Sequence, residues 1–131
     1  MNRFHFLFCL ALAPLCGCSS TGVEFGDLSG NTRTIGDADD GIELEQERIR
    51  YGDNDLAIYQ VTLRNTLSTR HTFEYRASWY NAEGMEIDNA TRSWRPLVLD
   101  GGSFTPVRSV APNIKAVHCD IEVREHRPMK P

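Results

Sequence analysis

HTFEYRASWYNAEG, residues 71–84, contains the clearest β-strand pattern of the chain and the turn that ends it. From residue 72 to 79, apolar and polar side chains alternate, as expected for a strand with one face toward a core. The apolar positions are Phe73, Tyr75, Ala77 and Trp79, and the polar positions are Thr72, Glu74, Arg76 and Ser78. Asn81-Ala82-Glu83-Gly84 then predicts a tight turn, because glycine can adopt a positive φ.

Further runs with strand periodicity lie on either side of this segment. Their ranges are 42–49, 56–65, 85–88, 94–99, 103–110 and 117–123. Asp100-Gly101-Gly102 predicts a hairpin between the runs that it joins. Short strands with frequent turns and an inward Trp79 predict an immunoglobulin-like antiparallel β-sandwich of six to seven strands over residues 42–125. We expect its core to depend on four aromatic side chains: Phe73, Trp79, Trp94 and Phe104.

A short apolar run at the N-terminus ends in Leu15-Cys16-Gly17-Cys18, which has the form of a lipoprotein signal. The run from Phe4 to Leu15 has the length of a signal-peptide core and is shorter than the roughly 20 residues of a membrane-spanning helix. We therefore expect residues 1–17 to be a signal peptide, cleaved after Gly17, with lipid attached to Cys18. A cysteine is unusual just before the glycine of such a motif, so an ordinary cleaved signal and a buried N-terminal segment are the alternatives.

The residues next to the lipidated cysteine predict where the protein is held. Ser19, rather than aspartate, directly after that cysteine favours the bacterial outer membrane, and we expect the domain on its periplasmic face. Residues 18–41 are rich in glycine and polar side chains and predict a flexible tether. At the other end, residues 126–131 contain two prolines and predict a tail that frays.

Cys119 would be the one unmodified thiol of the mature chain once the signal peptide is removed and Cys18 is lipidated. In the run 117–123 it shares a strand face with Val117, Ile121 and Val123. We expect a buried thiol, because free cysteine is among the most buried residue types. A reactive or dimer-forming thiol is the alternative.

The charge balance is acidic and argues against polyanionic partners. The chain has 14 basic and 18 acidic residues, and loss of residues 1–17 removes only Arg3 among them, which leaves about −5. The arginines are dispersed along the strands, and no basic patch is visible, which argues against nucleic acid and against anionic lipid headgroups. We expect these single charges at alternate positions to form a solvated sheet face.

Motifs of catalytic chemistry are absent from residues 18–131: there is no Gly-x-Ser-x-Gly, His-Glu-x-x-His, phosphate-binding glycine loop or Cys-x-x-Cys. His118, Asp120 and Glu122 share a strand face, but successive ones are about 6.8 Å apart, too far for one metal ion. The acidic run 37–40 lacks the spacing of a calcium loop. We therefore expect no enzyme activity, no cofactor, no metal site and no small-molecule substrate.

Four segments resemble the YcfL-like family of small bacterial lipoproteins. They are Val61–Asn65, Phe73–Ile87, Trp94–Leu99 and Ala111–Asn113, and the most specific part is Tyr75-Arg76-x-x-Trp79-Tyr80-Asn81-x-x-Gly84. The resemblance covers roughly residues 42–124. It implies an envelope lipoprotein of unassigned biochemical function and no catalytic residue. Some family members are encoded beside lipoproteins that activate cell-wall synthases, which implies a partner related to the cell wall.

These observations predict a non-catalytic binding or adaptor module that faces the periplasm and receives an envelope protein on one sheet face or edge. Tyr80, Trp94 and Arg95 form the candidate binding surface, provided that they cluster. The alternative is a structural envelope component that assembles with itself or with other lipoproteins. A long, uncapped edge strand would favour that alternative.

Overall fold

The computed structural model describes residues 27–128, except for the side chains of Asp37 and Asp39. The predicted signal peptide, the lipidated Cys18, the first part of the tether and residues 129–131 lie outside the described residues. No helix in the described part of the chain is long and apolar enough to cross a membrane.

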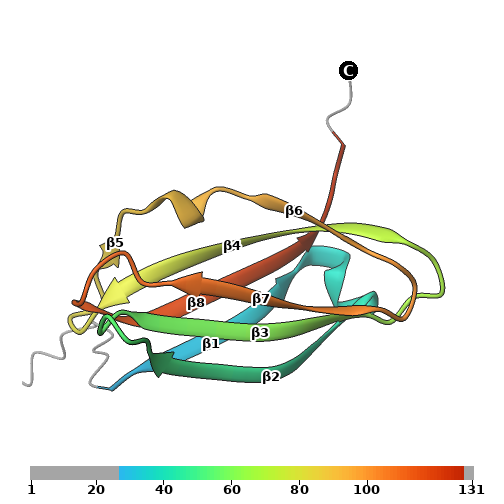
Figure 1. Cartoon of the computed structure of the whole chain (residues 1–131). Helices are drawn as coiled ribbons and strands as arrows, with labels where there is room; N and C mark the ends of the chain where they lie inside the picture. The colour runs from blue at the N-terminus through green and yellow to red at the C-terminus, as the bar shows by residue number, and fades with distance from the viewer. Residues whose placement is uncertain (1–26, 129–131) are drawn as a thin grey trace, which may run out of the picture.

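Eight strands form two sheets that pack face to face, which confirms the predicted all-β sandwich (Figure 1). The strands are β1 (Ser29–Ile35), β2 (Ile42–Tyr51), β3 (Ala57–Asn65), β4 (His71–Asn81), β5 (Glu86–Ile87), β6 (Arg95–Leu99), β7 (Phe104–Val110) and β8 (Ala116–Glu125). In the five-stranded sheet, β8 and β4 are central, β1 lies beyond β8, and β5 and β6 both pair with the other edge of β4. In the three-stranded sheet, β3 lies between β2 and β7. Seven strands match the predicted runs, and β1 is new.

β1 shows that the predicted tether is wrong for residues 29–41. The strand pairs in parallel with β8, which makes one exception to the predicted antiparallel arrangement. A short 3-10 helix, η1 (Gly36–Asp40), then leads into β2. The folded domain therefore begins at Ser29 rather than at Ile42.

The inward positions of β1 explain why its sequence does not resemble that of a strand. At Gly30 an added Cβ would lie 2.4 Å from the Tyr59 ring, so only glycine allows this close approach. Thr32 is buried, and its hydroxyl is hydrogen-bonded to Tyr59 Oη at 2.7 Å. Because small and polar residues occupy these inward positions, no apolar alternation marks the strand.

The predicted hairpin between residues 94–99 and 103–110 is wrong, although the turn between them is present. The Ser103 N–H donates to the Asp100 carbonyl oxygen at 3.0 Å. However, β6 pairs with β4 and β7 pairs with β3, so this turn connects the two sheets. The buried Asn65 amide donates to the Asp100 carbonyl oxygen at 3.2 Å and holds the turn across the end of the sandwich. Turn residues specify a chain reversal, whereas packing decides which sheet each strand joins.

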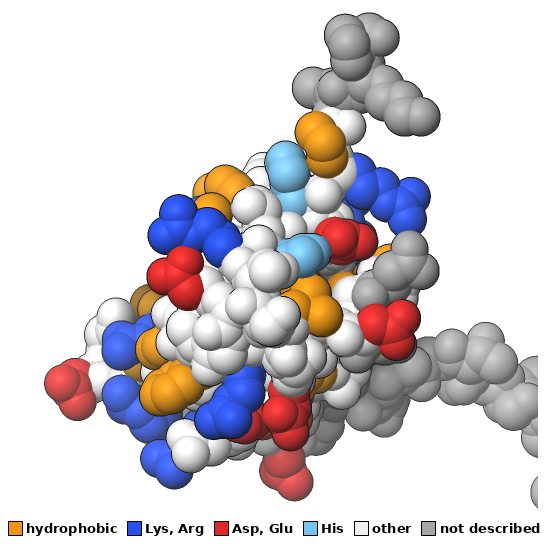
Figure 2. Space-filling model, turned by 90° about the vertical axis from the view of Figure 1, so that its right-hand side faces the viewer, with side chains coloured by type: hydrophobic (Ala, Val, Ile, Leu, Met, Phe, Trp, Pro, Cys, Tyr) orange, Lys and Arg blue, Asp and Glu red, His pale blue; other side chains and the backbone are white. Residues whose placement is uncertain are grey.

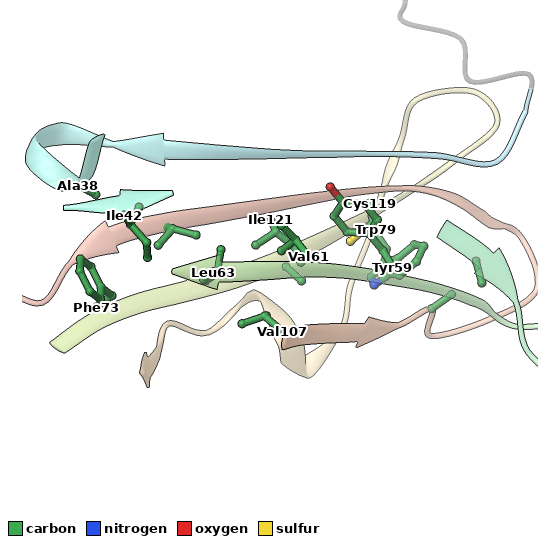
Figure 3. Close-up of a cluster of buried hydrophobic side chains, with 14 of the residues drawn as sticks. Ala38, Ile42, Tyr59, Val61, Leu63, Phe73, Trp79, Val107, Cys119 and Ile121 are labelled. Carbon is green, nitrogen blue, oxygen red and sulfur yellow. The ribbon is translucent and has the colours of Figure 1, made fainter. Parts of the chain in front are cut away.

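The core lies between the sheets, where Trp79, Tyr59 and Phe73 are its largest fully buried side chains (Figure 3). Trp79 Nε1 donates to Ser109 Oγ at 2.9 Å, so burial leaves the indole N–H paired. The predicted inward orientation of Trp79 and Phe73 is thus confirmed.

Two of the four expected core aromatics lie elsewhere. Phe104 is 63% exposed, and Trp94 lies on the outer face of the five-stranded sheet. Phe104 pairs in register with Arg64, whose side chain lies over its ring with Cζ 5.8 Å from the centroid. Both aromatic rings therefore pack against arginines on the outside of the sandwich.

The predicted tail also begins later than expected. The His126 N–H donates to the Thr72 carbonyl oxygen at 3.0 Å, and His126 Nδ1 lies 3.0 Å from Glu74 Oε1. Both contacts attach His126 to β4, so the ordered domain includes this residue.

Candidate functional site

A row of three charged side chains crosses the outer face of the five-stranded sheet. Glu122 of β8 is paired in register with Arg33 of β1 on one side and with Arg76 of β4 on the other. Residues paired in this way project from the same face. Glu122 accepts hydrogen bonds from Arg33 and from Arg76 Nε, the latter at 2.8 Å. Burial raises the pKa of Glu122, but the hydrogen bonds and charges of the two arginines outweigh burial and lower it.

A second pair of opposite charges lies in the next row of the same face. Glu74 of β4 is directly opposite Arg124 of β8, and Arg124 Nε donates to Glu74 Oε2 at 2.7 Å. The other carboxylate oxygen of Glu74 is bonded to His126. The hydrogen bonds of His126 and Arg124 hold the pKa of Glu74 below its ordinary value.

Trp94 joins these two rows. Its ring centroid is 3.8 Å from Cζ of Arg124 and 4.6 Å from Cζ of Arg76, within the range of cation–π attraction. Two guanidinium groups that are themselves bonded to carboxylates therefore hold one indole. We call this group the Trp94 cluster; it comprises Glu74, Arg76, Trp94, Glu122 and Arg124.

The segment between β5 and β6 positions Trp94. It contains a 3-10 turn, η2 (Ala90–Arg92), which is capped by Asn89 through a bond from the Thr91 N–H at 2.8 Å. Thr91 Oγ1 donates to the Ala77 carbonyl oxygen at 3.0 Å. Ala77 lies in the part of the β4 edge that neither β5 nor β6 pairs. The segment is thus attached to the sheet just before Trp94.

Of the three predicted surface residues, Tyr80 and Trp94 share this outer face, and Arg95 does not. Tyr80 lies at the far end of β4, with its ring centroid 5.9 Å from that of His118. Arg95 is paired with Tyr75, which packs against the core. Arg95 therefore projects from the opposite side of the sheet, and the three residues do not form one patch.

His118 and Glu122, expected on a solvated face, are buried instead. His118 Nδ1 is hydrogen-bonded to Ser29 Oγ at 2.7 Å, and its Nε2 is bonded to Asp120 Oδ1 at 2.8 Å. The reason is β1, which makes β8 a central strand. Within residues 27–128, no group of three or more His, Cys, Asp or Glu side chains could hold a metal ion.

Cys119 is fully buried, as the sequence predicts. Burial raises the pKa of its thiol well above the ordinary value. A thiol held neutral inside the core is a poor nucleophile, so Cys119 acts as a small core side chain.

The sequence contained a signal for the Trp94 cluster that the motif search missed. The order Glu-x-Arg recurs at outward positions, as Glu74-x-Arg76 and as Glu122-x-Arg124. When two such strands pair antiparallel, each glutamate can lie opposite an arginine of the other strand. The observed register has this arrangement.

One end of the sandwich carries no large apolar surface. In Figure 2, which views the end with the β3–β4 and β6–β7 connections, hydrophobic side chains form small groups among charges of both signs.

The comparisons with known proteins agree with the fold. A family model described as "Protein of unknown function (DUF1425)" matches residues 33–125. The crystal structure of a DUF1425 family member from Shewanella sp. pv-4 has a TM-score of 0.60 at 22% identity and covers 67% of this chain and 81% of that chain. The crystal structure of Campylobacter jejuni cj0090 has a TM-score of 0.56 at 20% identity and covers 63% and 85%. The search of curated proteins gave no match. Because the family model covers more than half of its length, the chain belongs to the DUF1425 family of proteins of unknown function.

Proposed function

We propose that this protein is a non-catalytic binding module of the bacterial cell envelope, which receives a partner protein on the Trp94 face of its five-stranded sheet. We further propose that it belongs to the YcfL-like lipoproteins within its family, with lipid on Cys18 and the domain on the periplasmic face of the outer membrane. The observation that carries the binding role is an indole held by two arginines on the outside of a sheet.

Trp94 and its neighbours have the composition of a binding hot spot. Tryptophan and arginine are the side chains most enriched among residues that dominate protein–protein affinity. Because Arg76 and Arg124 already restrain the indole, binding a partner would cost little additional side-chain entropy. The glutamates keep the arginines oriented, so the cluster presents one defined surface.

The strand edges favour this role over self-assembly. Pro96 in β6 and Pro106 in β7 each lack an N–H for a further strand. β2 contains an irregularity between Glu45 and Arg48, with Gln46 at a φ of 50°. Prolines and bulges of this kind hinder edge-to-edge pairing. Assembly with itself or with other lipoproteins is therefore the second candidate.

The binding role is tested by recovering envelope proteins with the full Cys18-anchored chain and with two variants. Trp94→Ala removes the ring of the cluster. Phe104→Ala is the matched control, because it removes an aromatic ring that also lies beneath an arginine but belongs to the other sheet. We expect Trp94→Ala to reduce partner recovery about tenfold or more and Phe104→Ala to leave it unchanged.

Two results would contradict the proposal. Equal recovery by Trp94→Ala and the unchanged chain would exclude the Trp94 face. Recovery of this chain alone would favour the structural alternative. The lipid anchor is tested separately by mass spectrometry of the mature N-terminus, where an unmodified Cys18 or a different first residue would refute it.

A further inference from the structure

The outer face of the three-stranded sheet gathers arginines that are far apart in the sequence. Arg48 of β2 and Arg108 of β7 are both paired in register with Gln60 of β3, one on each side. Arg50 lies in the next row, opposite Ile58. These five residues line a depression of about 180 Å³. The expectation that the arginines are dispersed and form no basic patch is therefore wrong for this face.

These arginines lack the carboxylate partners that other arginines of the protein have. Among the described residues, ion pairs within 4.0 Å join a carboxylate to each of Arg33, Arg64, Arg70, Arg76, Arg92 and Arg124. In the described part of the chain, no carboxylate lies within that distance of Arg48, Arg50 or Arg108, and the Arg50 side chain donates to the carbonyl oxygen of Tyr51. Three exposed positive charges therefore face water in a small area.

A comparison of the two sheets shows that the arginines of the three-stranded sheet lack a central carboxylate. In the five-stranded sheet, Glu122 lies between two arginines of neighbouring strands and accepts a hydrogen bond from each. In the three-stranded sheet, the same central position is occupied by Gln60, which is neutral. A bound anion would occupy the place that the carboxylate has in the other row.

We propose that Arg48, Arg50, Gln60 and Arg108, the arginine site, bind a phosphate group. Guanidinium groups form paired hydrogen bonds with phosphate oxygens, and several of them favour a group with more than one negative charge. The Gln60 amide adds a neutral donor, and Ile58 supplies an apolar floor. This inference concerns a different face from the Trp94 cluster and goes beyond the proposed function.

The position of Arg95 adds to the positive potential near this site. Arg95 also has no carboxylate within 4.0 Å among the described residues, and it lines a small cavity together with Arg108 and Ser109. The guanidinium groups without carboxylate partners thus concentrate around Arg108, which favours an anion there.

The experiment titrates inorganic phosphate into a chain of residues 19–131 and follows the Nε–Hε signals of the arginines by NMR. This chain retains all eight strands and every core residue. We expect saturable shifts of Arg48, Arg50 and Arg108, and about tenfold weaker binding in Arg48→Gln and in Arg108→Gln. Arg108→Lys, which keeps the charge but loses the planar fork, should bind with intermediate affinity.

Two further variants distinguish phosphate binding at the arginine site from a general effect of positive charge. Arg70→Gln removes an exposed arginine that is paired with Asp100, so it should leave phosphate binding unchanged. Gln60→Glu places a carboxylate between the arginines and should abolish binding. Equal weakening by Arg70→Gln, or no saturable shift with inorganic phosphate or vesicles, would overturn the proposal.

A second experiment with vesicles distinguishes a phosphate in a lipid headgroup from a soluble phosphate. Binding to vesicles of phosphatidylglycerol and phosphatidylcholine, lost in Arg48→Gln and Arg108→Gln, would identify a lipid headgroup. A response to inorganic phosphate without vesicle binding would identify a soluble phosphate. Vesicle binding that both arginine variants leave unchanged, without any response to inorganic phosphate, would contradict the site.

Discussion

The outer faces of the two sheets repeat one arrangement with one chemical difference. Each has a central-strand side chain between two arginines of the neighbouring strands, and this side chain is Glu122 in the five-stranded sheet and Gln60 in the three-stranded sheet. With glutamate the row is bonded internally and supports Trp94. With glutamine, neither Arg48 nor Arg108 has a carboxylate within 4.0 Å among residues 27–128. The carboxylate of Glu122 is therefore the difference between an internally bonded row in the five-stranded sheet and the proposed anion site in the three-stranded sheet.

Removal of the Glu122 carboxylate should have the largest effect. Glu122→Ala leaves Arg33 and Arg76 unpaired, and we expect the free energy of unfolding to fall by about 2 kcal/mol, because these arginines keep partial access to water. Urea denaturation measures the loss. The matched control is Glu45→Ala, which breaks a single ion pair of 3.4 Å with Arg64 on the other sheet and should cost less than about 1 kcal/mol. Equal losses of unfolding free energy in the two variants would mean that the charged rows of the two sheet faces do not differ in their contribution to stability.

Acid should weaken the five-stranded face first. The pKa values of Glu122 and Glu74 are lower in the folded protein than the ordinary value of 4.5, so the unfolded chain binds more protons as the pH falls. Their contribution to stability is complete above that value and is lost as the pH falls through the lower pKa values of the folded state. Urea midpoints between pH 6 and pH 3 should show the decline. Glu122→Gln should flatten it, and an unchanged slope would contradict the assignment.

Removal of the indole should have a moderate effect. Trp94→Ala deletes the cation–π contacts with both Arg76 and Arg124, and we expect a loss of about 1–2 kcal/mol. Phe104→Ala, which deletes one longer contact on the other sheet, should cost less. Thermal unfolding compares the two variants. If Phe104→Ala were the more destabilising, the Trp94 cluster would not be the better-organised surface.

The smallest expected effect is a gain in stability from Gln60→Glu. The new carboxylate would lie between Arg48 and Arg108, and we expect the free energy of unfolding to rise by about 0.5–1 kcal/mol. A double-mutant cycle with Arg108→Gln, followed by urea denaturation, isolates the new pair. A gain that persists in full after Arg108 is replaced would show that it does not arise from this row.

Local pattern was a good guide to the strands and a poor guide to their partners. The alternation in residues 71–80 predicted β4 and the inward direction of Trp79, because a two-residue period specifies which side chains share a face. β1 was missed, since Gly30 and Thr32 replace the apolar residues that would have marked it. The turn at residues 100–103 was recognised, but its two flanking strands belong to different sheets.

For the candidate surfaces, too, the sequence predicted single side chains better than it predicted which side chains lie together. Trp94 was singled out as an exposed aromatic, and it does lie on an outer face. Its grouping with Arg95 failed, because Arg95 is the first residue of β6 and is paired with Tyr75, so it projects from the side of the sheet that faces the core. The arginine site was missed altogether, since Arg48 and Arg108 are separated by most of the domain along the chain.

The all-β class, the positions of seven strands and the burial of Trp79 and Cys119 follow from local periodicity and side-chain polarity, so they could be predicted from the amino-acid sequence. The pairing of β1 with β8, the separation of β6 and β7 into different sheets and the identity of neighbouring charges depend on how the strands pack together. The physical reason is register: whether an arginine lies opposite Glu122 or Gln60 depends on pairing between strands that are distant in the chain.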